Sequence, residues 1–142
     1  DALHGEQVGI AALMLTRYYH AMRDYDFMRP VNLAATFDRS YLEPVYGDLT
    51  DGILRENLTD GEVSSSPLAF VPDAEKAEKV RAEIDSLISP EALERLLRLG
   101  GAPTTLSELG LPDDEEFIAR TLGFAPYVRK RLTLLKVLSA KR

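Results

Sequence analysis

The sequence predicts an all-α fold with several helices, on three observations. Apolar residues recur every three to four positions along several segments, and proline, glycine and helix-capping residues separate these segments. No run of alternating apolar and polar residues is long enough to indicate a strand. Residues 7–15 are apolar or small on every side, which is typical of a helix surrounded by protein. We therefore expect one multi-helix domain over residues 1–142, built around a buried N-terminal central helix.

Composition places the chain among ordinary globular domains. Its 142 residues are 45% hydrophobic and 28% charged, enough for one domain with a real core. The absence of cysteine excludes disulfides and thiolate metal sites, and the cytoplasm is the default compartment. No apolar run approaches the roughly 18 to 20 residues that span a bilayer. The first residues resemble neither a signal peptide nor a translation start, so we expect the chain to begin within a longer protein.

The net charge of -6 argues against a general nucleic-acid binder, which needs a basic stripe. The charge is uneven: acids dominate residues 38–62, whereas residues 128–142 carry bases and no acid. One interpretation is a solvated acidic surface and a frayed basic tail. The alternative is that the basic end faces an anionic ligand or another domain.

His4 is the first candidate functional residue. In a helix expected over residues 5–25, it shares an apolar face with Val8, Ala11 and Leu15, so we expect the imidazole to be buried. A second stripe of Gly5, Gly9, Ala12 and Thr16 predicts the close approach of another backbone or a ligand. His20 lies about 160° around the helix and cannot chelate one metal ion together with His4. A core histidine and a metal ligand both remain open from position alone.

The middle of the chain carries turn signals. Pro30 and Pro44 exclude a long helix, so short helices are expected over residues 31–37 and 39–46, with aromatic residues as anchors. Residues 48–72 predict a long loop with a short helix over 52–57. A domain linker is the competing interpretation, but it would leave a flanking segment too small to fold alone.

The second half predicts further helices with clear boundaries. A surface helix follows Pro72, and Ser89 and Pro90 start the next one, which Gly100 and Gly101 end. We expect the leucines of this helix, Leu93, Leu96 and Leu97, to be buried. Thr105 and Glu108 have the spacing of a capping box before a one-turn helix that ends at Gly110. Acids at 113–116 match the start of another helix, expected to end at Gly123.

The last helix is expected to begin at Pro126 and to bury Val128, Leu132, Leu135 and Leu138. Arg131 then falls inside this apolar stripe, where it either snorkels to water or points into a polar pocket. Arg129 lies on a different face. Both arginines are candidate binders of an anionic substrate.

Three separated segments resemble one enzyme superfamily. Residues 4–9 read HGEQVG and resemble the His-Gly-Glu signature of the iron-containing alcohol dehydrogenase, glycerol dehydrogenase and dehydroquinate synthase superfamily. Residues 89–111, which include APTT at 102–105, and YVRKRLTLL at 127–135 look like the sn-glycerol-1-phosphate dehydrogenase branch. Leu132 departs from the aromatic residue common in that branch.

The resemblance implies an all-helical, dehydroquinate synthase-like C-terminal domain, with an NAD(P)-binding domain upstream. It implies that His4 is one of three protein ligands to a divalent metal ion (Zn, Ni or Fe). It further implies reduction of glycerone phosphate or a related small phosphorylated polyol or ketone, with Arg131 or Arg129 holding the phosphate. The isolated chain is then expected to be inactive and to hold no cofactor, and a homo-oligomer is left open. The alternative is a non-catalytic helical interaction module derived from that family.

Overall fold

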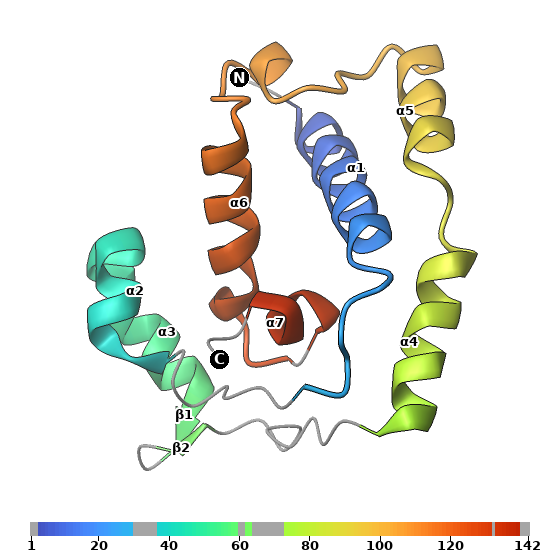
Figure 1. Ribbon diagram of the computed structural model, residues 1–142. Helices are drawn as coiled ribbons and strands as arrows, with labels where there is room; N and C mark the ends of the chain where they lie inside the picture. The colour runs from blue at the N-terminus through green and yellow to red at the C-terminus, as the bar shows by residue number, and fades with distance from the viewer. Residues whose placement is uncertain (1–2, 30–36, 60–61, 64–72, 132, 140–142) are drawn as a thin grey trace. The chain divides into compact units, whose positions relative to one another are not determined.

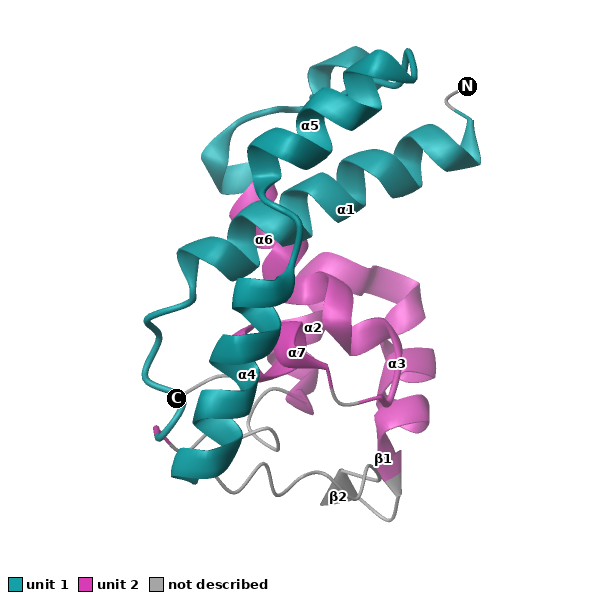
Figure 2. Ribbon diagram, turned by 90° about the vertical axis from the view of Figure 1, so that its right-hand side faces the viewer, with its two compact units in different colours: residues 1–28, 73–117 teal, residues 29–72, 118–142 magenta. Residues whose placement is uncertain are grey.

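The computed structural model describes residues 3–29, 37–59, 62–63, 73–131 and 133–139. The described chain is an all-α, multi-helix structure, as predicted (Figure 1). It divides into two compact units, one of residues 1–28 and 73–117, the other of residues 29–72 and 118–142 (Figure 2). The expectation of a single domain stays a prediction.

Unit 1 contains three α-helices, a 3-10 helix and the first turn of a fourth α-helix. They are α1 (His4–Ala21), α4 (Ala74–Ser86), α5 (Pro90–Leu99), η4 (Ser107–Leu109) and the start of α6 (Glu115–Phe124). Unit 2 contains the rest of α6 and several shorter elements. These are α2 (Arg39–Tyr46), η2 (Gly47–Leu49), α3 (Thr50–Asn57), β1 (Leu58–Thr59), β2 (Glu62–Val63), η5 (Ala125–Val128) and α7 (Leu134–Ser139). The two-residue strands pair antiparallel, Leu58 opposite Val63, and were not predicted.

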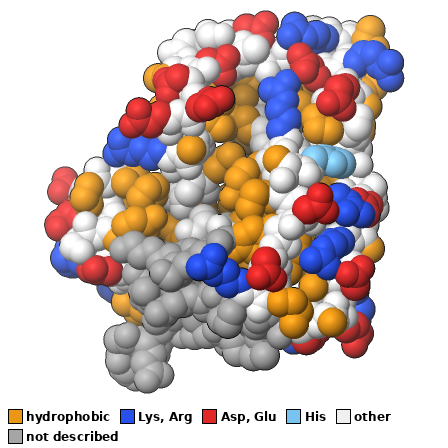
Figure 3. All heavy atoms as spheres, in the orientation of Figure 1, with side chains coloured by type: hydrophobic (Ala, Val, Ile, Leu, Met, Phe, Trp, Pro, Cys, Tyr) orange, Lys and Arg blue, Asp and Glu red, His pale blue; other side chains and the backbone are white. Residues whose placement is uncertain are grey.

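The N-terminal helix α1 is buried on one stripe rather than all round. Ile10, Leu13 and Thr16 are buried, and α1 lies beside α5 and α4 in unit 1 (Figure 2). The prediction that His4 lies on a buried face is wrong, because His4 is exposed and Val8 is 52% exposed. Figure 3 shows hydrophobic side chains at the surface over α1, beside the charged side chains of α4 and α5. A helix that is apolar on every side carries no polar face to indicate which stripe the neighbours cover.

The small-residue stripe of α1 has one close contact. A Cβ at Gly9 would lie 3.0 Å from Cδ2 of Leu97 on α5, whereas a Cβ at Gly5 would meet nothing within 4 Å. The predicted close approach is therefore present at Gly9, where a leucine side chain makes it rather than a backbone or a ligand.

Hydrogen bonds confirm the predicted starts of α4 and α5 and the predicted end of α5. Asp73 accepts from the Lys76 amide at 2.7 Å and Ser89 accepts from the Ala92 amide at 3.2 Å, so each caps the helix that follows. After α5, Gly101 adopts φ +73° and the Ala102 amide donates to the Leu97 carbonyl at 2.9 Å, a Schellman ending.

The predicted burial of the α5 leucines is wrong. Leu96 is 56% exposed, while Leu93 and Leu97 are half-buried. The capping signals at the ends of a helix say nothing about which neighbour covers its faces. In unit 1, Leu97 of α5 contacts α1 at Gly9.

The segment between α5 and α6 follows the sequence prediction. The Glu108 carboxylate accepts from the amides of Thr104 at 2.8 Å and Thr105 at 2.9 Å, and Gly110 ends η4 at φ +74°. These bonds, the Thr104 amide first, hold the pKa of Glu108 below its usual value. Asp114 accepts from the Phe117 amide at 2.8 Å and starts α6.

Unit 2 is organised around an aromatic core. Phe37, Leu42, Ile53 and Tyr127 are buried together, and the rings of Phe37 and Tyr127 meet edge-on at 5.5 Å. The predicted helix over 39–46 is confirmed as α2, and the short helix predicted over 52–57 begins two residues earlier, as α3. Apart from Phe37, the helix predicted over 31–37 lies outside the described residues.

The predicted single last helix is wrong. α6 passes through Gly123 to Phe124 and η5 follows; the described residues 129–131 and 133 are not helical, and α7 begins at Leu134. Arg129 has extended backbone angles, φ −130° and ψ 147°. The helical phase that placed Arg131 inside an apolar stripe therefore does not exist, and Arg131 is exposed.

Candidate functional site

His4 is the first residue of α1, and the residues around it fix this end of the helix. Leu3, the residue before the helix, cannot cap it with its own side chain. The Leu3 amide instead donates to Glu6 Oε2 at 2.7 Å, and its carbonyl accepts from the Glu6 amide at 3.0 Å. Glu6 of the motif thus holds the backbone immediately before His4.

The imidazole of His4 is exposed, and the adjoining Gly5 leaves open space on its side of the helix. The second histidine is engaged differently, since His20 Nε2 lies 3.2 Å from the carbonyl oxygen of Ile88 within unit 1. Among the described residues, no three His, Asp or Glu side chains come together as a metal site. His4 therefore offers at most one ligand of the three that a catalytic metal ion requires.

Arg129, a predicted substrate-binding residue, lines a hollow of about 300 Å³ in unit 2. One wall comes from the end of α2, η2 and α3, and the other comes from η5 and the residue after it. The lining residues are Tyr46, Leu49, Gly52, Ile53, Glu56, Val128 and Arg129. Arg131 is not among them. The structure thus separates two arginines that the sequence treated as alternatives.

Tyr46 stands at the edge of the aromatic core and lines the same hollow. Its hydroxyl donates to the carbonyl oxygen of Phe124. Burial, with Tyr127 and Tyr41 nearby, raises the pKa of Tyr46 to about 12. The phenol is therefore a neutral hydrogen-bonding group at physiological pH.

Behind this hollow, Lys136 of α7 is buried. Only 1% of the residue is exposed, and its Nζ donates to the Arg129 carbonyl at 2.5 Å and to Asn57 Oδ1 at 3.2 Å. The ammonium also lies 5.5 Å from the centre of the Phe37 ring. Burial lowers the pKa of Lys136, and no carboxylate within the described parts of the chain forms an ion pair with it.

The sequence prediction missed Lys136 and Asn57. A signal for Lys136 was present, because it is the one charged residue in the run Leu134–Leu138. Asn57 had no such signal, since an asparagine near the end of a short helix is ordinary.

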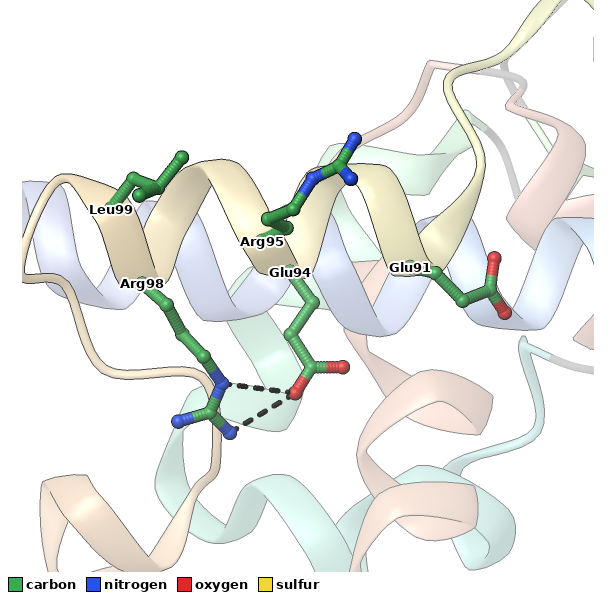
Figure 4. A pocket seen from close by; sticks show the side chains of 5 residues that line it. All are labelled: Glu91, Glu94, Arg95, Arg98 and Leu99. Carbon is green, nitrogen blue, oxygen red and sulfur yellow. Dashed lines mark hydrogen bonds and ion pairs between the residues drawn. The ribbon is translucent and has the colours of Figure 1, made fainter.

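A second hollow, of about 350 Å³, lies on α5 in unit 1 (Figure 4). Its lining residues are Glu91, Glu94, Arg95, Arg98 and Leu99. Glu94 accepts from Arg98 at 3.0 Å and from Arg17 of α1 at 2.7 Å, and these bonds, Arg98 first, lower the pKa of Glu94. The acidic and basic side chains that line this hollow partly neutralise one another, and all of them lie on a single exposed helix. This hollow is therefore a weaker candidate than the one at Arg129.

No family model, curated protein or solved structure matches this chain. Within the described residues, no helix is both long enough and apolar enough to cross a bilayer.

Proposed function

We propose that this chain is the helical, substrate-side part of a metal-dependent, NAD(P)-linked polyol dehydrogenase of the sn-glycerol-1-phosphate dehydrogenase type. The observation that carries the proposal is the exposed His4 imidazole at the start of α1, beside open space at Gly5. If the other metal ligands lie on another segment of the protein, the imidazole of His4 must be exposed to reach the same ion. The competing interpretation, a core histidine, requires a buried side chain, whereas His4 is exposed.

In this proposal His4 supplies one neutral imidazole nitrogen to a divalent ion, and an upstream nucleotide-binding domain supplies the other protein ligands and the NAD(P) site. The bound ion would polarise the oxygen of a ketone or alcohol. Arg129, which lines the unit 2 hollow, would bind a phosphate group there, with its guanidinium as a bidentate donor. Glu6 would keep His4 at its place at the helix start.

The test compares the two histidines in the complete protein that carries this chain. His4→Ala is expected to remove most bound metal and turnover while leaving helical content nearly intact, because one exposed imidazole contributes little packing. His20→Ala is the matched control on the same helix and should keep its metal. Metal analysis after dialysis, with circular dichroism, measures both. A His4→Ala protein that retains its metal and its turnover excludes His4 as a ligand.

A second candidate function is a non-catalytic helical interaction module. Leu96 and Leu99, three positions apart on α5 and 56% and 79% exposed, favour it, because adjoining exposed apolar side chains can form a contact surface. Titration of the complete protein with NADH and NADPH separates the two candidates. A dehydrogenase binds one of these coenzymes at micromolar concentration, whereas an interaction module binds neither.

A further inference from the structure

The backbone of Arg129 is held by a side chain rather than by a helix. Arg129 lies between η5 and α7 with extended backbone angles, so its carbonyl has left the helical hydrogen-bond pattern. That carbonyl accepts a hydrogen bond from Lys136 Nζ at 2.5 Å. The Arg129 carbonyl is part-buried at this bond, and a donor fixed inside the core favours the backbone conformation in which Arg129 lines the hollow.

The same network reaches α3, which forms the opposite wall of the hollow. Asn57 is fully buried, and its Oδ1 accepts from Lys136 while its Nδ2 donates to the Tyr127 carbonyl at 2.9 Å. Two carbonyls of the 127–129 segment are therefore tied to α3, one directly and one through Lys136. Three hydrogen bonds therefore join the wall that carries Arg129 to the wall that carries Gly52 and Glu56.

A lysine is a costly residue for this position. Its neighbours Leu135, Val137 and Leu138 are buried and apolar, and a methionine of similar length would fill the same space without bringing a charge out of water. What the lysine adds is a pair of hydrogen bonds, one to Asn57 and one to Arg129.

We infer that Lys136 is a positioning residue for Arg129, so that binding of a phosphorylated polyol at the unit 2 hollow depends on the Lys136 hydrogen bond to the Arg129 carbonyl. The inference rests on the proposed function, which assigns Arg129 to the substrate phosphate. Lys136 itself is too deeply buried to touch a ligand in the hollow.

The first part of the test uses Lys136→Met in the complete protein, with Leu135→Ala as the control. Leu135 is buried on the same helix, so its truncation lowers stability without removing a bond to Arg129. Calorimetry measures the binding of glycerol 1-phosphate and of glycerol. Lys136→Met should weaken the binding of glycerol 1-phosphate about tenfold, which is the effect of losing a charge-assisted hydrogen bond. Glycerol binding should be unchanged, and Leu135→Ala should change neither.

The second part adds Arg129→Ala and the double variant. Because Lys136 acts through Arg129, the double variant should bind glycerol 1-phosphate no more weakly than Arg129→Ala alone. In turnover, Lys136→Met should raise KM for glycerone phosphate and leave kcat nearly unchanged, since no reacting atom is displaced. Lys136→Gln serves as a second variant if Lys136→Met does not fold, and should weaken binding because its amide is carried on a shorter side chain.

Three results overturn the inference, and the first two differ in what they say of the proposed function. If Arg129→Ala weakens the binding of glycerol 1-phosphate but the Lys136 variants do not, Lys136 is not a positioning residue. The assignment of Arg129 to the phosphate then stands. If Arg129→Ala has no effect, the hollow is not the phosphate site, and the inference fails together with that part of the proposed function. Equal weakening by Leu135→Ala and Lys136→Met would indicate general loss of packing and would also overturn it.

Discussion

Lys136 Nζ donates a hydrogen bond to Asn57 Oδ1 at 3.2 Å, although 79 positions of sequence separate the two residues. Both side chains are buried, and their neighbours belong to α3, η5 and α7 of unit 2. A buried polar pair of this kind stabilises a fold only while each partner remains satisfied.

Asn57→Leu should lower the free energy of unfolding by about 3 kcal/mol, because it leaves Lys136 with one protein acceptor and removes the donor to the Tyr127 carbonyl. Urea denaturation followed by circular dichroism measures the change. Arg55→Leu, at an exposed position of the same helix, is the control and should stay within about 0.5 kcal/mol of the parent. Equal stability of the Asn57→Leu and parent proteins would contradict a structural role for the buried pair.

The stability contributed by Lys136 should rise with pH. Burial lowers its pKa in the folded chain below the usual 10.5, so the unfolded chain binds the proton more tightly. Between the folded-state pKa and about 10.5, raising the pH therefore increases the free energy of unfolding. Urea midpoints of the parent and Lys136→Met between pH 7 and pH 10.5 test this. The urea midpoint of the parent should rise relative to that of the variant as the pH rises. Midpoints that change in parallel with pH would contradict the prediction.

The stability contributed by Tyr46 should fall as the pH rises above about 10. Its pKa is about 12 in the folded chain against 10.0 unfolded, so the unfolded chain loses the phenol proton first. The stability from this group is complete below pH 10 and is lost as pH rises towards about 12. Tyr46→Phe should remove this alkaline loss and cost about 1 kcal/mol at neutral pH, where the Phe124 carbonyl loses its donor. Denaturation at pH 9 and pH 11 measures both effects. Tyr25→Phe, in unit 1, is the control and should keep the parent's alkaline loss.

In unit 1, Leu13→Asp should unfold the region around α1. Leu13 is 1% exposed, and a carboxylate there would be buried without a partner, at a cost above about 4 kcal/mol. Ala11→Asp, two residues earlier on an exposed face of the same helix, is the matched control and should melt near the parent temperature. Thermal melting by circular dichroism separates the two variants. A Leu13→Asp protein with unchanged melting would place Leu13 outside the core.

Local sequence signals determined where most helices begin and end. Ser89 before Pro90, Thr105 with Glu108, and Gly101 after α5 each act through hydrogen bonds to residues at most five positions away. Such short-range hydrogen bonds depend on the types and spacing of neighbouring residues, which can be read directly from the sequence. The all-α class follows from the same signals.

The tertiary structure alone decided which faces are covered and which polar groups meet. His4 is exposed because α5 and α4 lie beside a different part of α1, and a helix that is apolar all round does not encode that choice. Arg129 and Arg131 take different surroundings because the chain leaves the helix after Val128, where periodicity predicted that it continues. Lys136 reads in sequence as an interruption of an apolar run, and only the approach of Asn57 from α3 makes it a buried hydrogen-bonded group. Contacts across such sequence distances depend on packing, which no local pattern specifies.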